Sequence, residues 1–158
     1  MIALVDTNVV LDVMLGREPH LAASSAVLAA VETGRCRGLL CATTITTIHY
    51  IAERQIGNQA SLKRISELMS IFGIAAINQG VLGSAIVRDM PDFEDAVIHE
   101  AAIQAGGQCI VTRNVDDFAA AEIPVYNPEQ FIAALDNEDA AQAHGEQRLT
   151  RPESKGES

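Results

Sequence analysis

Five short apolar runs, separated by longer helix-like stretches, constrain this chain more than any other feature. Each run is too short for a helix. It also lacks the alternation of apolar and polar residues seen in a strand with one solvent-exposed face, so it is typical of a strand buried on both faces. The runs are Ile2–Val5, Leu39–Ala42, Gly73–Ile77, Cys109–Val111 and Ile123–Tyr126. Pro124 in the last run indicates an edge strand, because proline cannot donate to a central ladder.

The stretches between these runs have helical character, and glycines such as Gly34 and Gly106 stand where helices are expected to stop. Gly57 splits one region into a predicted helical hairpin. Strands that alternate with helices predict a parallel sheet inside a three-layer α/β fold. The expected helices are Asn8–Leu15, Leu21–Thr33, Thr44–Gln55, Ala60–Phe72, Gly80–Met90, Asp92–Ala105 and Pro128–Leu135.

The composition changes after residue 135. From Asp136 to Ser158 the chain has no Ile, Val or Phe and a single Leu, and its six acids outnumber its three bases. Such a segment cannot bury enough apolar surface to order itself. We therefore expect one folded domain at 1–135, and an acidic, disordered tail at 136–158 that is helical in its first turn at most.

The charge of the chain limits its partners. Twenty-one acids against eleven bases give a formal net charge of −10, which excludes a broad basic surface for nucleic acid but not a local basic patch. Aromatic residues make up only 4% and there is no Trp, which argues against base stacking as a main binding device. The three cysteines have no CxxC spacing, and no apolar run approaches the roughly 20 residues that cross a bilayer, so we expect a cytoplasmic protein and no membrane partner.

Carboxylates follow the expected strands at several points. Asp6, Thr7 and Asn8 come directly after the first strand, and the segment 112–118 follows the fourth. A further acidic segment, 90–96, opens the helix before the fourth strand. In open parallel sheets, ligands bind beyond the carboxyl ends of the strands, where the strand order reverses, so these acids mark a candidate site.

Each acid also has an ordinary structural interpretation. Asp6 and Asp92 stand where N-caps are expected, and Asp95 suits the first turn of a helix. Asp116 and Asp117 are typical of a solvated turn that Phe118 anchors on the core. Against this, Asp92 and Asp95 share a helix face, where like charges repel.

Several carboxylates with few other reactive groups favour binding of a divalent metal ion. Mg²⁺ and Mn²⁺ prefer oxygen ligands, keep several waters, and can activate one of them against a phosphodiester. Unpaired acids gathered in a fold are unfavourable without such a cation, because burial and mutual repulsion oppose their ionisation. The four histidines lack zinc-ligand spacing, and we expect His49 and His99 to be structural, although His99 could border the site.

Four segments together resemble a PIN domain, and in particular the stand-alone bacterial VapC-type toxins. The segments lie in the PIN order and spacing within residues 1–135. They are Asp6-Thr7-Asn8-Val9-Val10-Leu11-Asp12, Asp92-Phe93-Glu94-Asp95-Ala96, Thr112-Arg113-Asn114 with Asp117-Phe118, and Ile123-Pro124-Val125 with Pro128-Glu129-Gln130-Phe131.

The resemblance implies a PIN-like α/β/α fold with a parallel five-stranded sheet in the order 3-2-1-4-5, and a ribonuclease that uses Mg²⁺ or Mn²⁺. At matching positions, Asp6, Asp95 and Asp117 would be the catalytic, metal-organising carboxylates. The expected supporting residues are Thr7 and Asn8 beside the first acid, and Asn114 and Asp116 beside the last.

The sequence departs from the PIN pattern in one place. PIN ribonucleases usually carry a glutamate on the helix after the second strand, where this chain has Thr47. We expect Asp92, one turn before Asp95, to supply the missing acid as a further metal ligand.

The leading hypothesis is an endoribonuclease toxin of a type II toxin–antitoxin pair, with RNA as substrate, a cognate antitoxin and a homodimeric state. The alternative is a PIN-fold module that has little or no activity and binds RNA or protein, which the missing glutamate favours. A phosphoacceptor receiver domain would need a lysine after the fifth strand, and the chain has lysines only at 63 and 155. A DxDx[TV] phosphatase would need a second aspartate where Asn8 stands.

Overall fold

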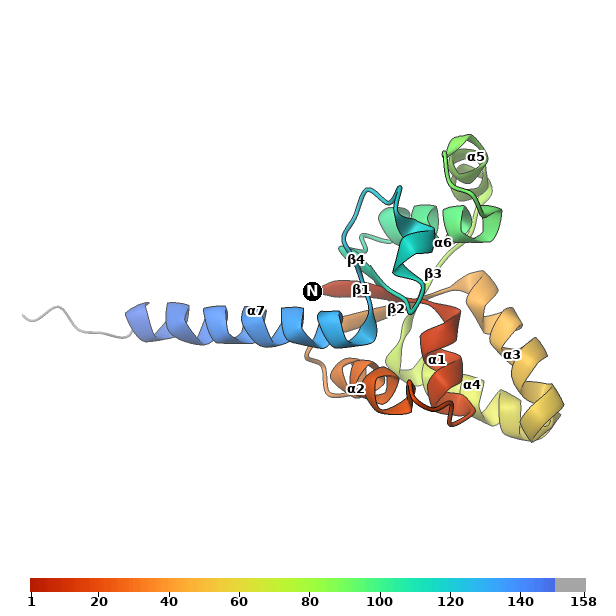
Figure 1. The fold of residues 1–158 in the computed structure, drawn as a ribbon, viewed down its shortest axis with the longest axis horizontal. Helices are drawn as coiled ribbons and strands as arrows, with labels where there is room; N and C mark the ends of the chain where they lie inside the picture. Colours follow the sequence, from red (N-terminus) through yellow and green to blue (C-terminus); the bar gives the residue numbers. More distant parts are fainter. Residues whose placement is uncertain (150–158) are drawn as a thin grey trace, which may run out of the picture.

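A five-stranded parallel sheet forms the centre of the molecule in the computed structural model, which describes residues 1–149 (Figure 1). The strand order is β3-β2-β1-β4-β5, which confirms the expected topology. Leu4 pairs with Leu39 on one side and with Ile110 on the other. The strands are β1 (Ile2–Val5), β2 (Arg37–Cys41), β3 (Gly73–Ala75), β4 (Cys109–Val111) and β5 (Val125–Tyr126).

The strands are apolar because helices cover both faces of the sheet. Ala3, Leu4 and Val5 have no exposed surface, and neither do Ile110 and Val111 on the neighbouring strand. Complete burial of both faces removes any selection for alternating polar residues. The strands β1 and β4 are thus buried on both faces, as their apolar runs predict.

Within residues 1–149, six helices and a short 3-10 turn connect the strands close to the expected bounds, and a seventh helix follows β5. They are α1 (Thr7–Met14), α2 (Leu21–Glu32), α3 (Ala42–Ile56), α4 (Asn58–Ile71), α5 (Gln79–Val87), α6 (Phe93–Gln104), η1 (Val115–Phe118) and α7 (Pro128–Leu149). As predicted, α3 and α4 form a helical hairpin. Gly57 joins them with a φ of 85°, a conformation that glycine adopts without strain.

Two apolar clusters, one on each face of the sheet, make the three layers. Val9, Val27, Ile48 and Ile65 from α1 to α4 pack on one face, together with Phe131 of α7. On the other face, Val81 of α5 packs with Val97 and Ile98 of α6 and with Phe118 of η1. The strands contribute alternate residues to the two clusters, for example Val5 to one and Leu4 to the other.

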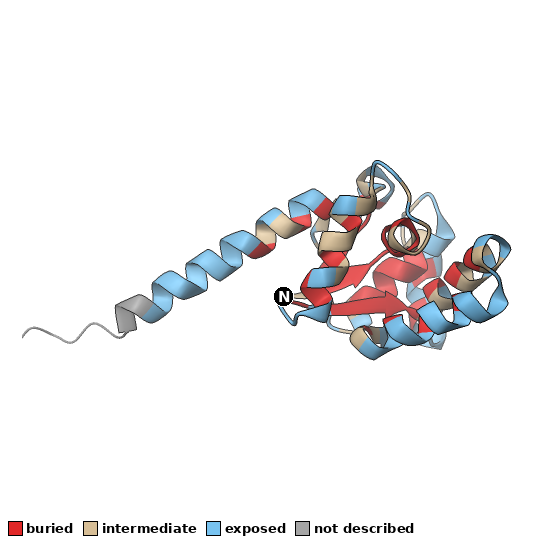
Figure 2. Cartoon of the chain, turned by 90° about the horizontal axis from the view of Figure 1, so that it is seen from below, coloured by how far each residue is buried: buried red, intermediate tan, exposed pale blue. Residues whose placement is uncertain are grey.

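The last helix differs from the sequence expectation. We expect disorder after the first turn beyond Leu135, but α7 continues to Leu149 and projects from the body (Figures 1 and 2). Phe131 and Leu135 are fully buried, whereas 136–146 is exposed throughout. Arg35 holds the start of this exposed part through Asp136 (2.8 Å) and Asp139 (2.7 Å). A domain boundary at 135 stays a prediction, and residues 150–158 lie outside the described part.

No helix within residues 1–149 is long and apolar enough to span a bilayer. The longest helix, α7, contains Asp136 and Asp139 near its middle.

We expect truncation after Asp139 to leave a folded domain, because residues 140–146, the described part of α7 beyond that point, are all exposed. Its melting temperature should stay within about 5 °C of the full chain, the shift that roughly 1 kcal/mol produces in a domain of this size. The control is truncation after Gln130, which also removes Phe131 and Leu135. Loss of such large buried side chains costs about 2–5 kcal/mol each. Loss of cooperative unfolding in the protein truncated after Asp139 would contradict the prediction.

Candidate active site at the carboxyl ends of the strands

Asp6 lies where β1 ends beside β4. Its backbone N–H donates to the carbonyl of Val111 (2.9 Å), so the parallel ladder continues one residue beyond β1. The residues that follow the two strands, Asp6 and Thr112, are therefore neighbours. This is the point at which the strand order reverses, as the sequence predicts for a site.

Hydrogen bonds fix the carboxylate of Asp6, which is only 8% exposed. The hydroxyl of Thr112 donates to Oδ2 (2.8 Å), and the backbone N–H of Thr7 donates to Oδ1 (2.7 Å). Asn8 Nδ2 lies 3.4 Å from Oδ2. Asp6 is thus the N-cap of α1, and the cap and the site are the same residue.

Thr7 and Asn8 tie this carboxylate to the neighbouring loops. The hydroxyl of Thr7 donates to the hydroxyl of Thr44 at the start of α3 (3.2 Å). Asn8 donates to Thr112 Oγ1 (3.3 Å) and accepts from the backbone N–H of Arg113 (3.2 Å). The position of Asp6 therefore depends on α1, α3 and the residues after β4 together.

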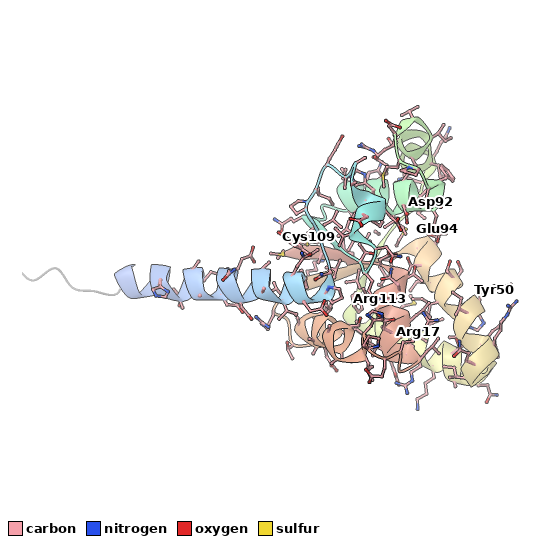
Figure 3. The ribbon with its side chains drawn as sticks, viewed as in Figure 1. Arg17, Tyr50, Asp92, Glu94, Cys109 and Arg113 are labelled. Carbon is pink, nitrogen blue, oxygen red and sulfur yellow. The ribbon has the colours of Figure 1, made fainter. Side chains whose placement is uncertain are left out.

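Asp92 and Asp95 begin α6. Asp92 accepts from the backbone N–H of Asp95 (3.0 Å), so its predicted role as an N-cap is confirmed. Figure 3 labels Asp92 and Glu94 at this end of α6. Asp95 is partly buried, and within the described residues its carboxylate has no hydrogen-bond or ion-pair partner.

Asp116 and Asp117 lie on η1 and are both exposed. Phe118 is 2% exposed and anchors this turn on the core, as expected. Asn114 holds the turn by its backbone, because its carbonyl accepts from the N–H of Asp117 (3.1 Å). The side chain of Asn114 is exposed and makes no hydrogen bond in the described structure, so its expected support of a carboxylate stays a prediction.

The charges of Asp6, Asp95 and Asp117 influence one another. The pKa of Asp95 is raised to about 7, first by burial and then by the charges of Asp6, Asp92 and Asp117, with Glu94 adding to them. Burial also raises the pKa of Asp6, and the hydrogen bonds from Thr112 and Thr7 oppose that rise. The charge of Asp117 adds to the rise for Asp6, whereas the charge of Arg113 opposes it.

The donor set of this site consists of oxygen atoms. Carboxylates with unshared lone pairs suit Mg²⁺ or Mn²⁺, which favour such ligands and complete their shell with water. Among residues 1–149, no three acidic, His or Cys side chains converge closely enough to hold one ion directly. The charges of Asp6, Asp92 and Asp117 nevertheless reach Asp95, so coordination partly through water fits this arrangement better than a closed cage.

Thr47 is partly buried on α3 and makes no hydrogen bond in the described structure. It lies one turn after Thr44, which contacts Thr7. Residues three apart share a helix face, so Thr47 is on the side of α3 that carries this contact. A role for Thr47 in the site stays a prediction.

The comparisons with known proteins agree with this geometry. Residues 3–116 match the family model described as PIN domain. The chain belongs to the PIN-domain family. A search among curated proteins finds no significant match.

Several solved structures have a similar fold. A toxin–antitoxin complex from Klebsiella pneumoniae has a TM-score of 0.62 at 25% identity, covering 80% of this chain and 97% of that chain. VapBC2 from Rickettsia felis, bound to a promoter DNA fragment, has a TM-score of 0.61 at 13% identity, and the match covers 80% of this chain and 98% of that chain. VapC20 from Mycobacterium tuberculosis, a toxin that cleaves the sarcin–ricin loop, has a TM-score of 0.61 at 14% identity, and the match covers 75% of this chain and 94% of that chain.

Sequence reasoning missed a buried ion pair in this PIN domain. Arg113 Nε lies 2.8 Å from Oδ2 of Asp12, which has no exposed surface, and the hydroxyl of Ser24 donates to the same oxygen (3.0 Å). Both Asp12 and Arg113 stand in the segments that resemble the family. Their partnership could not be found, because it joins residues about a hundred positions apart.

His99 is structural, as expected, and does not border the acids. Its Nε2 accepts from the backbone N–H of Glu122 (3.0 Å), and Nδ1 lies 3.2 Å from Glu100. Arg88 pairs with both Glu100 and Glu122. This buried group joins α5 and α6 to the segment before β5.

We expect Asp95→Asn to stabilise the metal-free PIN domain in a pH-dependent way. Because the pKa of Asp95 is raised in the folded state, folded protein binds this proton more tightly than unfolded chain, and stability falls as pH rises from about 4 to about 7. Asparagine does not titrate and escapes this loss. Thermal unfolding in EDTA should give a variant that melts above wild type at about pH 8, with the difference shrinking towards about pH 4.

The matched control is Glu138→Gln on α7, which removes an exposed charge outside the site and outside the ion pairs of Arg35. Its effect on the melting temperature should not grow between about pH 4 and about pH 8 in the way that the Asp95 effect does. A pH-independent effect of Asp95→Asn would show that this carboxylate is not under strain in the folded protein.

Proposed function

We propose that this protein is a Mg²⁺- or Mn²⁺-dependent endoribonuclease and the toxin of a type II toxin–antitoxin pair. The observation that carries the proposal is the position of Asp6 where β1 ends beside β4, with further acids at the start of α6 and on η1. The raised pKa of Asp95, caused first by burial and then by the charges of Asp6, Asp92 and Asp117, is consistent with it. Acids from three separate segments thus act on Asp95, whose carboxylate has no ion-pair partner in the described structure. Such an arrangement is costly to a fold and is typical of a metal-binding site.

The metal ligands in this proposal are Asp6, Asp95 and Asp117, with Asp92 as a further acid beside them. When bound, the ion would activate a water molecule and neutralise charge on the phosphodiester. Asp6 is the most rigid ligand, because Thr112 and Thr7 hold its carboxylate. Asp95 and Asp117 have unshared carboxylate oxygens in the described structure and are free to accept the ion or its water.

The supporting residues act through position. Thr7 and Asn8 hold the carboxylate of Asp6, and Thr7 also binds Thr44 on α3. The backbone of Asn114 fixes η1, which carries Asp117. Asp116 adds negative charge to the rim. Thr47 would present a hydroxyl on the α3 side, where it could contact water of the metal shell.

Relatives of known structure support an antitoxin partner. The VapBC structures from Rickettsia felis and Salmonella typhimurium and the FitAB structure are toxin–antitoxin complexes. We carry that partner to this chain as a proposal, together with RNA as substrate, a homodimeric state and a cytoplasmic location.

One observation favours a second function, a PIN-fold module that binds RNA or protein with little or no cleavage. Thr47 stands where the family usually has a glutamate, so the site has one acid fewer on the α3 side. The two functions separate on catalysis. The module would bind RNA or protein without a metal-dependent change in the length of the RNA.

We expect the purified full chain to cleave single-stranded RNA with Mg²⁺ or Mn²⁺ and to stop when EDTA is added. Asp95→Asn and Asp117→Asn should each lower the rate by about a hundredfold or more, because a metal ion supplies several kcal/mol of transition-state stabilisation. The measurement is the initial rate on a labelled RNA. Asp139→Asn is the control and should keep the wild-type rate, and equal rates for all four proteins would exclude the site.

Mn²⁺ should raise the melting temperature of the wild-type protein without any substrate. A ligand that binds only the folded state stabilises it by about 2.7 kcal/mol at a hundredfold excess over its dissociation constant. Asp117→Asn should melt at or above wild type in EDTA and respond less to Mn²⁺, since its carboxylate makes no hydrogen bond that the substitution would break. A wild-type melting temperature that is identical in EDTA and in Mn²⁺ would mean that the acids bind no metal.

A further inference from the structure

A trough leads away from Asp117 along the surface. Two cavities, of about 480 and about 240 Å³, share Arg113 and Asn127 as a common wall. The larger is also lined by Asn114, Asp117 and Gln130. The smaller continues between the starts of α2 and α7. The trough therefore begins at the candidate metal site and extends past one fixed cation.

Arg113 is anchored along one edge and open along the other. Its Nε lies 2.8 Å from the buried carboxylate of Asp12, which Ser24 also holds. Its two terminal nitrogens have no hydrogen-bond or ion-pair partner among the described residues, and its side chain is 26% exposed. In Figure 3, Arg113 lies where the start of α7 meets α1. A guanidinium held in this way is pre-oriented for a phosphate.

Two amide side chains add donors whose orientation is fixed. Asn127 Oδ1 accepts from the backbone N–H of Gln130 (2.8 Å), and Gln130 Oε1 accepts from the backbone N–H of Asn127 (3.0 Å). Only the carbonyl oxygens can satisfy these two N–H groups, which settles the placement of the amide nitrogens. Both NH₂ groups are left without a partner in the described structure, and both residues line the larger cavity.

The lining combines donors with acceptors. Arg113, Asn127 and Gln130 can donate to an anion, whereas Asp116 and Asp117 in the same cavity can only accept when ionised. A wholly anionic ligand would be repelled by these acids. A nucleotide fits both sets, because its phosphate accepts hydrogen bonds while its ribose hydroxyls and base amino groups donate them. The volume lies within the range of small-ligand sites.

We propose that this trough binds the nucleotide that flanks the cleaved bond of an RNA strand. Arg113 binds the phosphate of that nucleotide, and the amide nitrogens of Asn127 and Gln130 donate to it. The sharing of Arg113 by both cavities continues the track for the strand towards α2. The identification of the ligand as part of an RNA strand rests on the proposed function, whereas the donors and the cavity do not.

The test is nucleotide binding by the metal-free full chain, followed by NMR of nitrogen-labelled protein. Adenosine and uridine 5′-monophosphates are the probes. Saturable shifts should occur at the side-chain NH₂ signals of Asn127 and Gln130 and at Nε of Arg113. The NH₂ signal of Gln142, which is exposed further along α7, should not move. Shifts that are absent at these three groups, or that are scattered over the chain, would overturn the proposal.

Gln130→Glu is the decisive variant. It keeps the oxygen that caps Asn127 and replaces the free NH₂ by a charged oxygen, so the fold should survive. We expect nucleotide affinity to fall by about tenfold or more, the effect of losing a hydrogen bond to a charged group. Gln142→Glu makes the same charge change on the same helix outside the trough and should bind as wild type does. Equal affinities for the two variants would overturn the subsite.

Cleavage assays separate this proposal from the proposed function. If wild type binds nucleotides at the trough but no metal restores RNA cleavage, the subsite is supported and the nuclease function fails. If wild type cleaves RNA while Gln130→Glu and Gln142→Glu have the same KM, the nuclease stands and the subsite is overturned. A higher KM in Gln130→Glu alone, with kcat nearly unchanged, supports both.

Discussion

The parallel pairing of β1 with β4 is the contact on which the candidate site depends. Val5 pairs with Val111, and the ladder ends with the N–H of Asp6 bound to the carbonyl of Val111. The next residues on both strands are polar, and they meet. Thr112 donates to Asp6, while Asn8 bridges Thr112 and the backbone of Arg113. A shift of one residue in this register would remove every one of these bonds.

A second constraint is electrostatic. The fold gathers like charges at the edge of a protein that already carries a net charge of −10. The pKa of Asp95 is raised as a result, first by partial burial and then by the charges of Asp6, Asp92 and Asp117. Repulsion of this kind is relieved by a proton or by a cation. In the proposed nuclease, a bound metal ion would relieve this repulsion and would also attract the anionic substrate. It would thereby compensate for the lack of a broad basic surface.

Two buried polar groups hold the surroundings of the site in place. Asp12 and Ser24 position Arg113 and join α1 to α2. On the other face of the sheet, Glu100 pairs with Arg88 and His99. In each group an arginine pairs with a buried carboxylate, and removal of the arginine would leave a buried charge without compensation. The loops that carry the acids are thus attached to the layers at several points and not by backbone alone.

The sequence alone determined the elements of this PIN domain. Runs such as Ile2–Val5 and Cys109–Val111 specify buried strands, because complete burial excludes polar alternation, and Gly57 marks the hairpin because few other residues adopt its φ without strain. Local rules also identified the caps Asp6 and Asp92. The strand order came from resemblance and not from local pattern. The helical course of α7 beyond Leu135 was missed, because its composition signals poor burial and says little about an exposed helix.

Tertiary structure alone decided which polar residues meet. Thr112 with Asp6, Thr44 with Thr7 and Arg113 with Asp12 are pairs separated by 106, 37 and about a hundred positions. No local pattern specifies such pairs, because each depends on the order of strands and on the way in which helices pack across them. The unbonded amide nitrogens of Asn127 and Gln130 belong to the same class. Their sequence predicts a helix start, and only the folded chain places them on the wall of a cavity beside Asp117.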